Sequence, residues 1–175
     1  MIEAGTIERA AEAAAAAGDL ALILLDLNMP GAIGYSGVAL LHAEAPTVPI
    51  LVISSADIGS LHRAARFGAI AAIGKDASLE AIEQGIAAAL AGERQEVPAL
   101  DPDPIAARVA SLTPTQLRVL LGVLAGRLNK QIAFDIGTSE ATVKTHMTAV
   151  LRKLEVGNRT QAALAAHALG LETGR

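Results

Sequence analysis

The chain has 175 residues, no cysteine and a net charge of −4, and aromatic residues make up only 2% of it. The length suits one large or two small domains, and the lack of cysteine excludes disulfides and thiolate metal sites. The strongest apolar run, 20–25, is far shorter than the roughly 18 residues of a membrane span. Because no signal peptide is recognisable either, we expect a cytoplasmic protein without membrane contact.

The charge is divided unevenly along the chain. Residues 1–103 hold 5 basic and 14 acidic residues, a net charge of −9, and residues 104–175 hold 9 basic and 4 acidic residues, a net charge of +5. An acidic half joined to a basic half indicates two domains, of which the second favours a polyanion. Small domains also differ in charge by chance, so the charge alone decides nothing.

The first half alternates helical patterns with short apolar runs. Helices are predicted at 6–17, 38–44, 57–67 and 78–90, and strands at 20–25, 49–53 and 70–74. The run at 20–25 is continuously apolar, as expected of a parallel strand buried on both faces. This alternation predicts a three-layer α/β domain over 1–92. A linker with three prolines is predicted over 93–110, and a helical domain over 111–175.

Three polar residues directly follow the predicted strands: Asp26, Ser54 and Lys75. Ligands and chemistry gather at the carboxyl ends of parallel strands, and a carboxylate, a hydroxyl and an ammonium suit a phosphoryl group. Asp26 would be the nucleophile, Ser54 would hydrogen-bond a phosphoryl oxygen, and Lys75 would neutralise its charge. The alternative is that each residue only marks the end of a strand.

The segments around these residues resemble the receiver domain of bacterial response regulators, and they read LILLDLNMPG (22–31), VPILVISSAD (48–57) and GAIAAIGKD (68–76). The resemblance implies a flavodoxin-like parallel sheet and a histidine kinase as the partner. It makes Asp26 the phosphoacceptor, Ser54 the switch hydroxyl and Lys75 the phosphate-binding lysine. It also implies that the backbone carbonyl of Asn28 ligates Mg²⁺ beside Asp26, and that the small Ser55 leaves room for phosphoryl entry.

The sequence departs from the receiver pattern at two points. Ala72 stands where receivers carry a coupling aromatic residue. The first strand and the acidic pair that binds Mg²⁺ are missing, because the residues before Asp26 match a receiver only from the end of its second strand onward. We therefore expect a weak or absent Mg²⁺ site at Asp26 and Asn28. The intact Asp26, Ser54 and Lys75 favour a truncated receiver over a naturally degenerate one.

An enzymatic alternative is a phosphatase of the haloacid dehalogenase type, which also uses an aspartate after a strand. Such an enzyme needs a second aspartate two residues later as general acid and base. Asn28 occupies that position here and cannot transfer a proton in that way. We therefore expect that the protein is not an enzyme.

The second half carries helix signals. Thr113 and Pro114 begin a helix that Gly126 ends, a short helix follows at 129–136, and Gly137 provides a tight turn. A third helix is predicted at 140–154, with Ser139 as its N-cap. Its apolar face would pack inward, and its opposite face would carry Lys144, Thr145, Thr148 and Arg152.

The polar face of the third helix suits a DNA major groove, where lysine reads guanine and threonine offers a hydroxyl or methyl contact. Asn129, Lys130 and Thr142 lie near helix N-termini and would hold phosphates. The alternative is an ordinary amphipathic helix with a solvated face. His146 and His167 are expected at packing or surface positions, and Tyr35 and Phe134 are expected to pack locally.

Residues 112–162 resemble the LuxR/NarL-type output domain along nearly their whole length, especially in SEATVKTH and in the LRKLEV…RT ending. The resemblance implies a four-helix helix-turn-helix domain whose last helix, 159–169, forms a homodimer contact. Gln116 stands where that family usually has glutamate. We therefore expect a dimeric regulator that binds double-stranded DNA under the control of a kinase. The alternatives are a regulator that needs no phosphorylation and an interaction protein that sequesters a kinase or another regulator.

Overall fold

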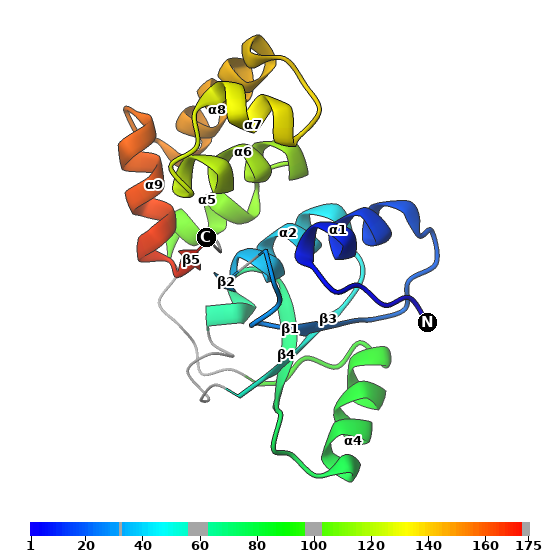
Figure 1. Cartoon of the computed structure of the whole chain (residues 1–175). Helices are drawn as coiled ribbons and strands as arrows, with labels where there is room; N and C mark the ends of the chain where they lie inside the picture. The colour runs from blue at the N-terminus through cyan, green and yellow to red at the C-terminus, as the bar shows by residue number, and fades with distance from the viewer. Residues whose placement is uncertain (32, 56–62, 97–102, 173–175) are drawn as a thin grey trace.

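The computed structural model describes residues 1–31, 33–55, 63–96 and 103–172 (Figure 1). Over these ranges the chain forms an α/β part up to residue 96 and a mainly helical part from residue 103 onward. The two parts lie against each other through α2 and α6. None of the described helices is long and apolar enough to cross a membrane.

The centre of the first part is a parallel sheet of three strands in the order β1 (Ile23–Asp26), β3 (Ile50–Ser54) and β4 (Ala69–Gly74). Asp26 lies opposite Ile53 on β3, and Ser54 lies opposite Gly74 on β4. Because the strands run in the same direction, their carboxyl ends meet at one edge. The predicted parallel sheet is confirmed.

Helices cover both faces of this sheet. Helices α1 (Ile7–Ala16) and α2 (Ser36–Glu44) pack together over one face, and α4 (Leu79–Leu90) packs on β3 and β4 from the other (Figure 1). The side chains of Thr6 and Ser78 accept hydrogen bonds from the third N–H of α1 and α4, which fixes where these helices begin. The layer beneath α1 and α2 is filled by aliphatic side chains that include Leu25, Val38, Leu41, Ile50 and Val52.

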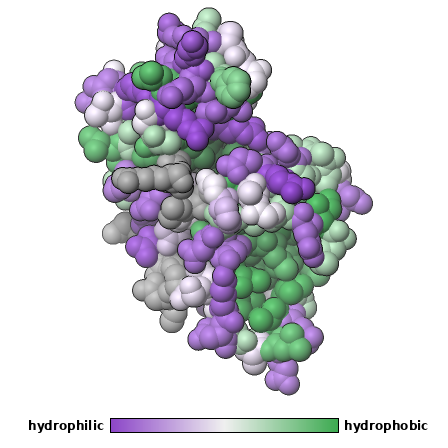
Figure 2. Space-filling model, in the orientation of Figure 1, coloured by the Kyte–Doolittle hydropathy of each residue, from purple (hydrophilic) through white to green (hydrophobic). Residues whose placement is uncertain are grey.

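Strand β1 is the edge of the described sheet. The apolar run at 20–25 predicts burial on both faces, and this prediction is wrong for Leu24, which is 48% exposed. Helix α4 packs mainly on β3 and β4, and Leu24 lies on the edge strand, where it stays exposed. Leu24 and the exposed Met1, Ile2 and Leu90 line a hollow of about 1050 Å³. Figure 2 shows the apolar surface in this region.

The second part contains five helices among the described residues: α5 (Pro104–Ala110), α6 (Pro114–Leu124), α7 (Asn129–Asp135), α8 (Glu140–Leu154) and α9 (Arg159–Ala168). Helix α8 has the predicted bounds and the predicted N-cap, Ser139. At the start of α6, Thr113 and Gln116 exchange side chain–backbone hydrogen bonds in a capping box. The core of this part is buried aliphatic surface from Leu117, Leu120, Ile132, Val143, Val150 and Leu154.

Two short strands join the two parts, and neither was predicted. β2 (Ile33–Gly34) pairs antiparallel with β5 (Leu171–Glu172), so a loop of the α/β part bonds to the segment that follows α9. Strands of two residues leave no periodic pattern in the sequence. Only the tertiary arrangement brings these segments into register, since the paired residues Gly34 and Leu171 are 137 positions apart in the sequence.

Three other sequence predictions differ from the structure or fall outside it. The predicted linker at 93–110 contains α5, which Asp103 caps and which buries Val109 against the helical part. Of the predicted helix at 57–67, residues 57–62 lie outside the described ranges. Phe134 was expected to pack locally, but it is 87% exposed.

Gly68 offers a test of this packing. It has a φ of +107°, and a Cβ there would collide with the ring of His42 on α2. We expect Gly68→Ala to lower the free energy of unfolding by about 1–3 kcal/mol. Tyr35 is the single tyrosine and the chain has no tryptophan, so urea unfolding can be followed by Tyr35 fluorescence.

Gly92 is the matched control for this substitution. Its φ of +77° is also positive, but nothing lies within 4 Å of an added Cβ. Gly92→Ala should therefore carry only the conformational cost and destabilise less than Gly68→Ala. Equal losses of stability would show that the contact with His42 is unimportant.

Candidate functional site

The carboxyl edge of the sheet brings two of the three predicted residues into direct contact. Asp26 ends β1, and Lys75 follows β4. The Lys75 Nζ lies 2.5 Å from the Asp26 Oδ2. Ser54 ends β3 between these strands and is buried, and its backbone carbonyl accepts a hydrogen bond from the Lys75 N–H at 3.0 Å. The order of the strands thus places all three residues at one edge.

Both carboxylate oxygens of Asp26 accept hydrogen bonds. Oδ2 accepts one from the Lys75 ammonium, and Oδ1 accepts one from the Asn28 N–H at 3.0 Å. Partial burial raises the pKa of Asp26. The hydrogen bonds from Lys75 and Asn28, together with the positive charge of Lys75, outweigh burial and leave the pKa below its ordinary value. Asp26 is therefore ionised at neutral pH, as a nucleophile must be.

The residues around Asp26 do not fit a Mg²⁺ site. Within the described ranges, no group of three or more histidine, aspartate or glutamate side chains is arranged to hold a metal ion. Asp26 is a single carboxylate, and an ammonium already neutralises it. A divalent cation needs several oxygen ligands and would have to displace Lys75. The charge that a metal ion would balance is balanced here by Lys75.

Helix α8 presents two different faces. Val143, Met147, Val150 and Leu154 are buried against the other helices. Lys144, Thr145, Thr148 and Arg152 are all exposed, as predicted from their spacing. The structure thus supports the predicted division of α8 into a packing face and a solvent face.

The side chains on the exposed face of α8 are partly held in place. The hydroxyls of Thr145 and Thr148 donate to the carbonyls of Ala141 and Lys144, at 3.1 and 3.0 Å. Their remaining lone pairs and their methyl groups are left for an outside contact. Lys144 forms an exposed ion pair with Glu140 at 3.0 Å, which contributes little to stability and can be exchanged.

The other predicted phosphate contacts lie at two helix starts. Asn129 and Lys130 form the first turn of α7, where Lys130 is exposed and Asn129 is half-buried. Thr142 lies in the first turn of α8, where its hydroxyl is 2.8 Å from that of Ser139 and its N–H donates to Ser139. Among the described residues, these three lie on α7 and α8 and form a site separate from that of Asp26 at the edge of the sheet.

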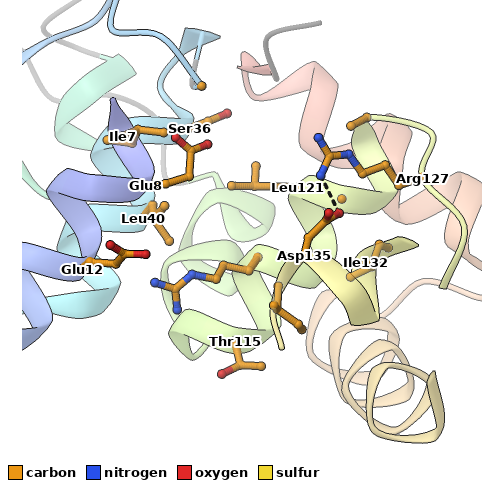
Figure 3. Close-up of a pocket in the computed structure, with 15 residues that line it drawn as sticks. Ile7, Glu8, Glu12, Ser36, Leu40, Thr115, Leu121, Arg127, Ile132 and Asp135 are labelled. Atoms are coloured by element: carbon orange, nitrogen blue, oxygen red, sulfur yellow. Dashed lines mark hydrogen bonds and ion pairs between the residues drawn. The ribbon is translucent and has the colours of Figure 1, made fainter. Parts of the chain in front are cut away.

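A cavity of about 370 Å³ between the two parts was missed by sequence reasoning (Figure 3). Glu8 and Glu12 of α1 face it from one side, and the ion pair of Arg127 with Asp135 borders it on the other. Beside it, Arg118 of α6 forms an ion pair with the nearly buried Glu44 of α2 at 2.6 Å. Because Glu44 and Arg118 are far apart in the sequence, no sequence motif predicts their ion pair or the cavity beside it.

The pairing of Asp26 with Lys75 makes a prediction about pH. Removing the ammonium with Lys75→Met should raise the pKa of Asp26, because burial still acts on the carboxyl while the hydrogen bond and the charge of Lys75, which lower this pKa, are lost. The pKa can be measured by carbon NMR titration of the Asp26 carboxyl. Lys130→Met, in the other part of the chain, is the control and should leave it unchanged.

The same pair determines how stability varies in acid. Because the pKa of Asp26 is lowered by folding, its contribution to stability is present above the pKa of the unfolded chain, near pH 4. It is lost as the pH falls through the lower value of the folded protein. Lys75→Met should remove most of this loss of stability in acid, which urea unfolding at several pH values measures. An unaltered pH dependence of the free energy of unfolding would contradict a role of the Asp26–Lys75 pair.

Comparisons with known proteins match both parts of the chain. Residues 2–87 match the model of the response regulator receiver domain, and residues 110–166 match the model of bacterial regulatory proteins of the luxR family. The glycerol metabolism activator of Pseudomonas putida is 38% identical over 85% of this chain and 74% of its own length. The transcriptional regulatory protein LiaR of Bacillus subtilis is 32% identical over 83% of this chain and 74% of its own.

Among solved structures, full-length FixJ from B. japonicum is 25% identical with a TM-score of 0.38, covering 93% of this chain and 81% of that chain. The receiver family matches the part of the chain that forms the parallel sheet, and the luxR family matches the helical part that contains α8. The chain belongs to the family of transcriptional response regulators that join a receiver domain to a LuxR-type DNA-binding domain.

Proposed function

We propose that this regulator reads double-stranded DNA with the exposed face of α8, as a dimer on paired half-sites. The observation that carries the proposal is the face of α8 formed by Lys144, Thr145, Thr148 and Arg152. All four side chains are exposed while the opposite face is buried. A helix that presents cations and small hydroxyls in this way fits a major groove.

The side chains divide between base and phosphate contacts. Lys144 and Thr145 lie in the first half of α8 and Thr148 lies just past its middle, and all three would reach base edges. Arg152 lies further along, and Lys130 and Asn129 begin α7, so these would contact phosphates. Base contacts give sequence preference, and phosphate contacts give salt-dependent affinity without it.

Dimerisation through α9 is part of the proposal. Ala162 and Ala166 of this helix are buried, and Leu164 is 65% exposed. A large apolar side chain on the outer face of a helix is suited to a contact with a second copy. Two copies would place two α8 helices on neighbouring half-sites of the duplex.

We further propose that a histidine kinase phosphorylates Asp26. The ionised carboxylate is the nucleophile, and attack on the phosphorus of phosphohistidine would form an acyl phosphate while the bond to the imidazole breaks. The Lys75 ammonium contacts the Asp26 Oδ2, and it would stay beside the phosphoryl group and balance its negative charge. Ser54 ends the neighbouring strand and would hydrogen-bond a phosphoryl oxygen.

Substitutions on α8 test the DNA-reading face. Lys144→Ala should abolish the preference for the specific site over a scrambled one, a loss of about 1–3 kcal/mol in discrimination. Arg152→Ala is the contrasting variant. It should weaken binding to both sequences alike and lower the salt slope by about one. The measurement is fluorescence anisotropy with promoter fragments at several salt concentrations, and unchanged specificity in Lys144→Ala would refute the assignment.

Labelling tests the phosphoacceptor. After incubation with a radioactive small-molecule phosphoryl donor and Mg²⁺, the wild-type chain should incorporate label slowly, because the acidic pair of the receiver pattern has no counterpart before Asp26. Asp26→Asn should incorporate none, and Asp76→Asn is the control that should label as the wild type does. Label retained in Asp26→Asn would exclude Asp26 as the acceptor.

A further inference from the structure

A row of exposed residues along α8 begins with a carboxylate. Glu140, Lys144, Thr148 and Arg152 follow one another at intervals of four residues, and all of them are exposed. Residues at this interval in an α-helix lie on the same face, about 6 Å apart along its axis. The face that we propose for reading DNA therefore carries a negative charge in its first turn, next to Lys144.

The position of Glu140 sets it apart from the other acidic residues of the DNA-binding part. Residues 104–175 contain four acidic residues. Asp135 and Glu155 form ion pairs with arginines outside the exposed row of α8, and Glu172 lies on β5. Glu140 is therefore the acidic residue whose charge would enter the same DNA groove as the cations of the row.

A carboxylate on a surface that faces DNA is unfavourable unless it meets a hydrogen-bond donor. The phosphates repel it, and guanine and thymine present acceptors and no donor in the major groove. The amino groups of cytosine and adenine are the donors there, and glutamate accepts from the cytosine N4. Lysine has the opposite requirement and donates to the O6 and N7 of guanine. Glu140 and Lys144 thus suit the two different bases of a G·C pair.

The two side chains already lie at the spacing of one base pair. The Lys144 Nζ is 3.0 Å from the Glu140 Oε1. Within a G·C pair, the guanine O6 and the cytosine N4 are also about 3 Å apart, because they are hydrogen-bonded to each other. The second hydrogen of the cytosine N4 faces the groove and can be donated to an outside acceptor. The ammonium can therefore contact the guanine O6 while the carboxylate contacts the cytosine N4.

The hydroxyls beside this pair are left mainly as acceptors. Those of Thr145 and Thr148 already donate to the carbonyls of Ala141 and Lys144. Their free lone pairs can accept from the amino group of a base, but these hydroxyls have no second hydrogen to donate to guanine. In this part of α8 the donation to a guanine therefore falls to the Lys144 ammonium.

We propose that Glu140 is a specificity-determining residue, and that the Glu140–Lys144 pair reads one G·C base pair in a single orientation. The reversed base pair would place the carboxylate against the guanine O6 and the ammonium against the cytosine amino group, and both contacts are repulsive. A T·A pair presents the same order of oxygen and amino group, but thymine lacks the N7 that lysine also contacts on guanine. This reading of a base pair rests on the proposed docking of α8 in the major groove.

Selection of binding sites from a pool of duplexes with randomised paired half-sites tests this reading. The wild-type chain should select a site in which one G·C pair of each half-site is fixed. Glu140→Ala should relax the preference for that pair about tenfold. It should also bind a non-specific duplex more tightly, because a charge that the phosphates repel is removed. Glu155→Ala, whose carboxylate lies outside the exposed row, is the matched control and should select the wild-type site.

A modified base tests which atom Glu140 contacts. N4-methylcytosine keeps its pairing with guanine but carries a methyl group in place of the hydrogen that faces the groove. Fluorescence anisotropy with the selected duplex, carrying this base at the fixed pair, should show about tenfold weaker binding of the wild type. Glu140→Ala should bind the modified and unmodified duplexes equally. Equal weakening of both proteins, or no weakening of either, would overturn the contact.

The outcomes separate this contact from the docking of α8. A wild-type chain that selects no sequence from the pool would overturn the proposed reading of DNA, and the base-pair contact with it. A selected site that Glu140→Ala leaves unaltered would overturn the base-pair contact alone, because Lys144, Thr145 and Thr148 would then read the site without Glu140.

Discussion

The common direction of the three strands is the constraint on which the rest of this molecule depends. A parallel sheet brings every strand to its end at the same edge, so Asp26, Ser54 and Lys75 meet there although long segments separate them. The pairing of Lys75 with Asp26 follows from that geometry. The chain that leaves this edge after Asp26 leads to β2, which pairs with β5 beyond α9.

Electrostatic balance at this edge differs from that of a metal-dependent site. An ammonium neutralises the Asp26 carboxylate and keeps its pKa below the ordinary value, while burial acts in the opposite direction. The Asn28 N–H and the Lys75 ammonium bind opposite oxygens of the same carboxylate, so both lie beside the atom that would react.

The two domains differ in how much apolar surface they leave exposed. The DNA-binding domain closes its core, with Val143, Leu120 and Val150 fully buried and with side-chain caps at the starts of α6, α8 and α9. The receiver leaves the outer edge of β1 open, with Leu24 in solvent beside an apolar hollow. Exposed apolar surface at an open strand edge is costly and prone to association.

The sequence by itself determined the strands of the parallel sheet, the helices α6 to α9 and the residue types of both sites, because helix caps, helical spacing and apolar runs are local signals. Ser139 and the spacing of α8 predicted its bounds and its exposed face, and the polar residues after three apolar runs predicted the edge with Asp26. The tertiary structure alone decided the exposure of Leu24, the ion pair of Glu44 with Arg118 and the bonds of Ser36 to Glu172. These depend on contacts between distant segments, for which short strands and single side chains leave no periodic signal.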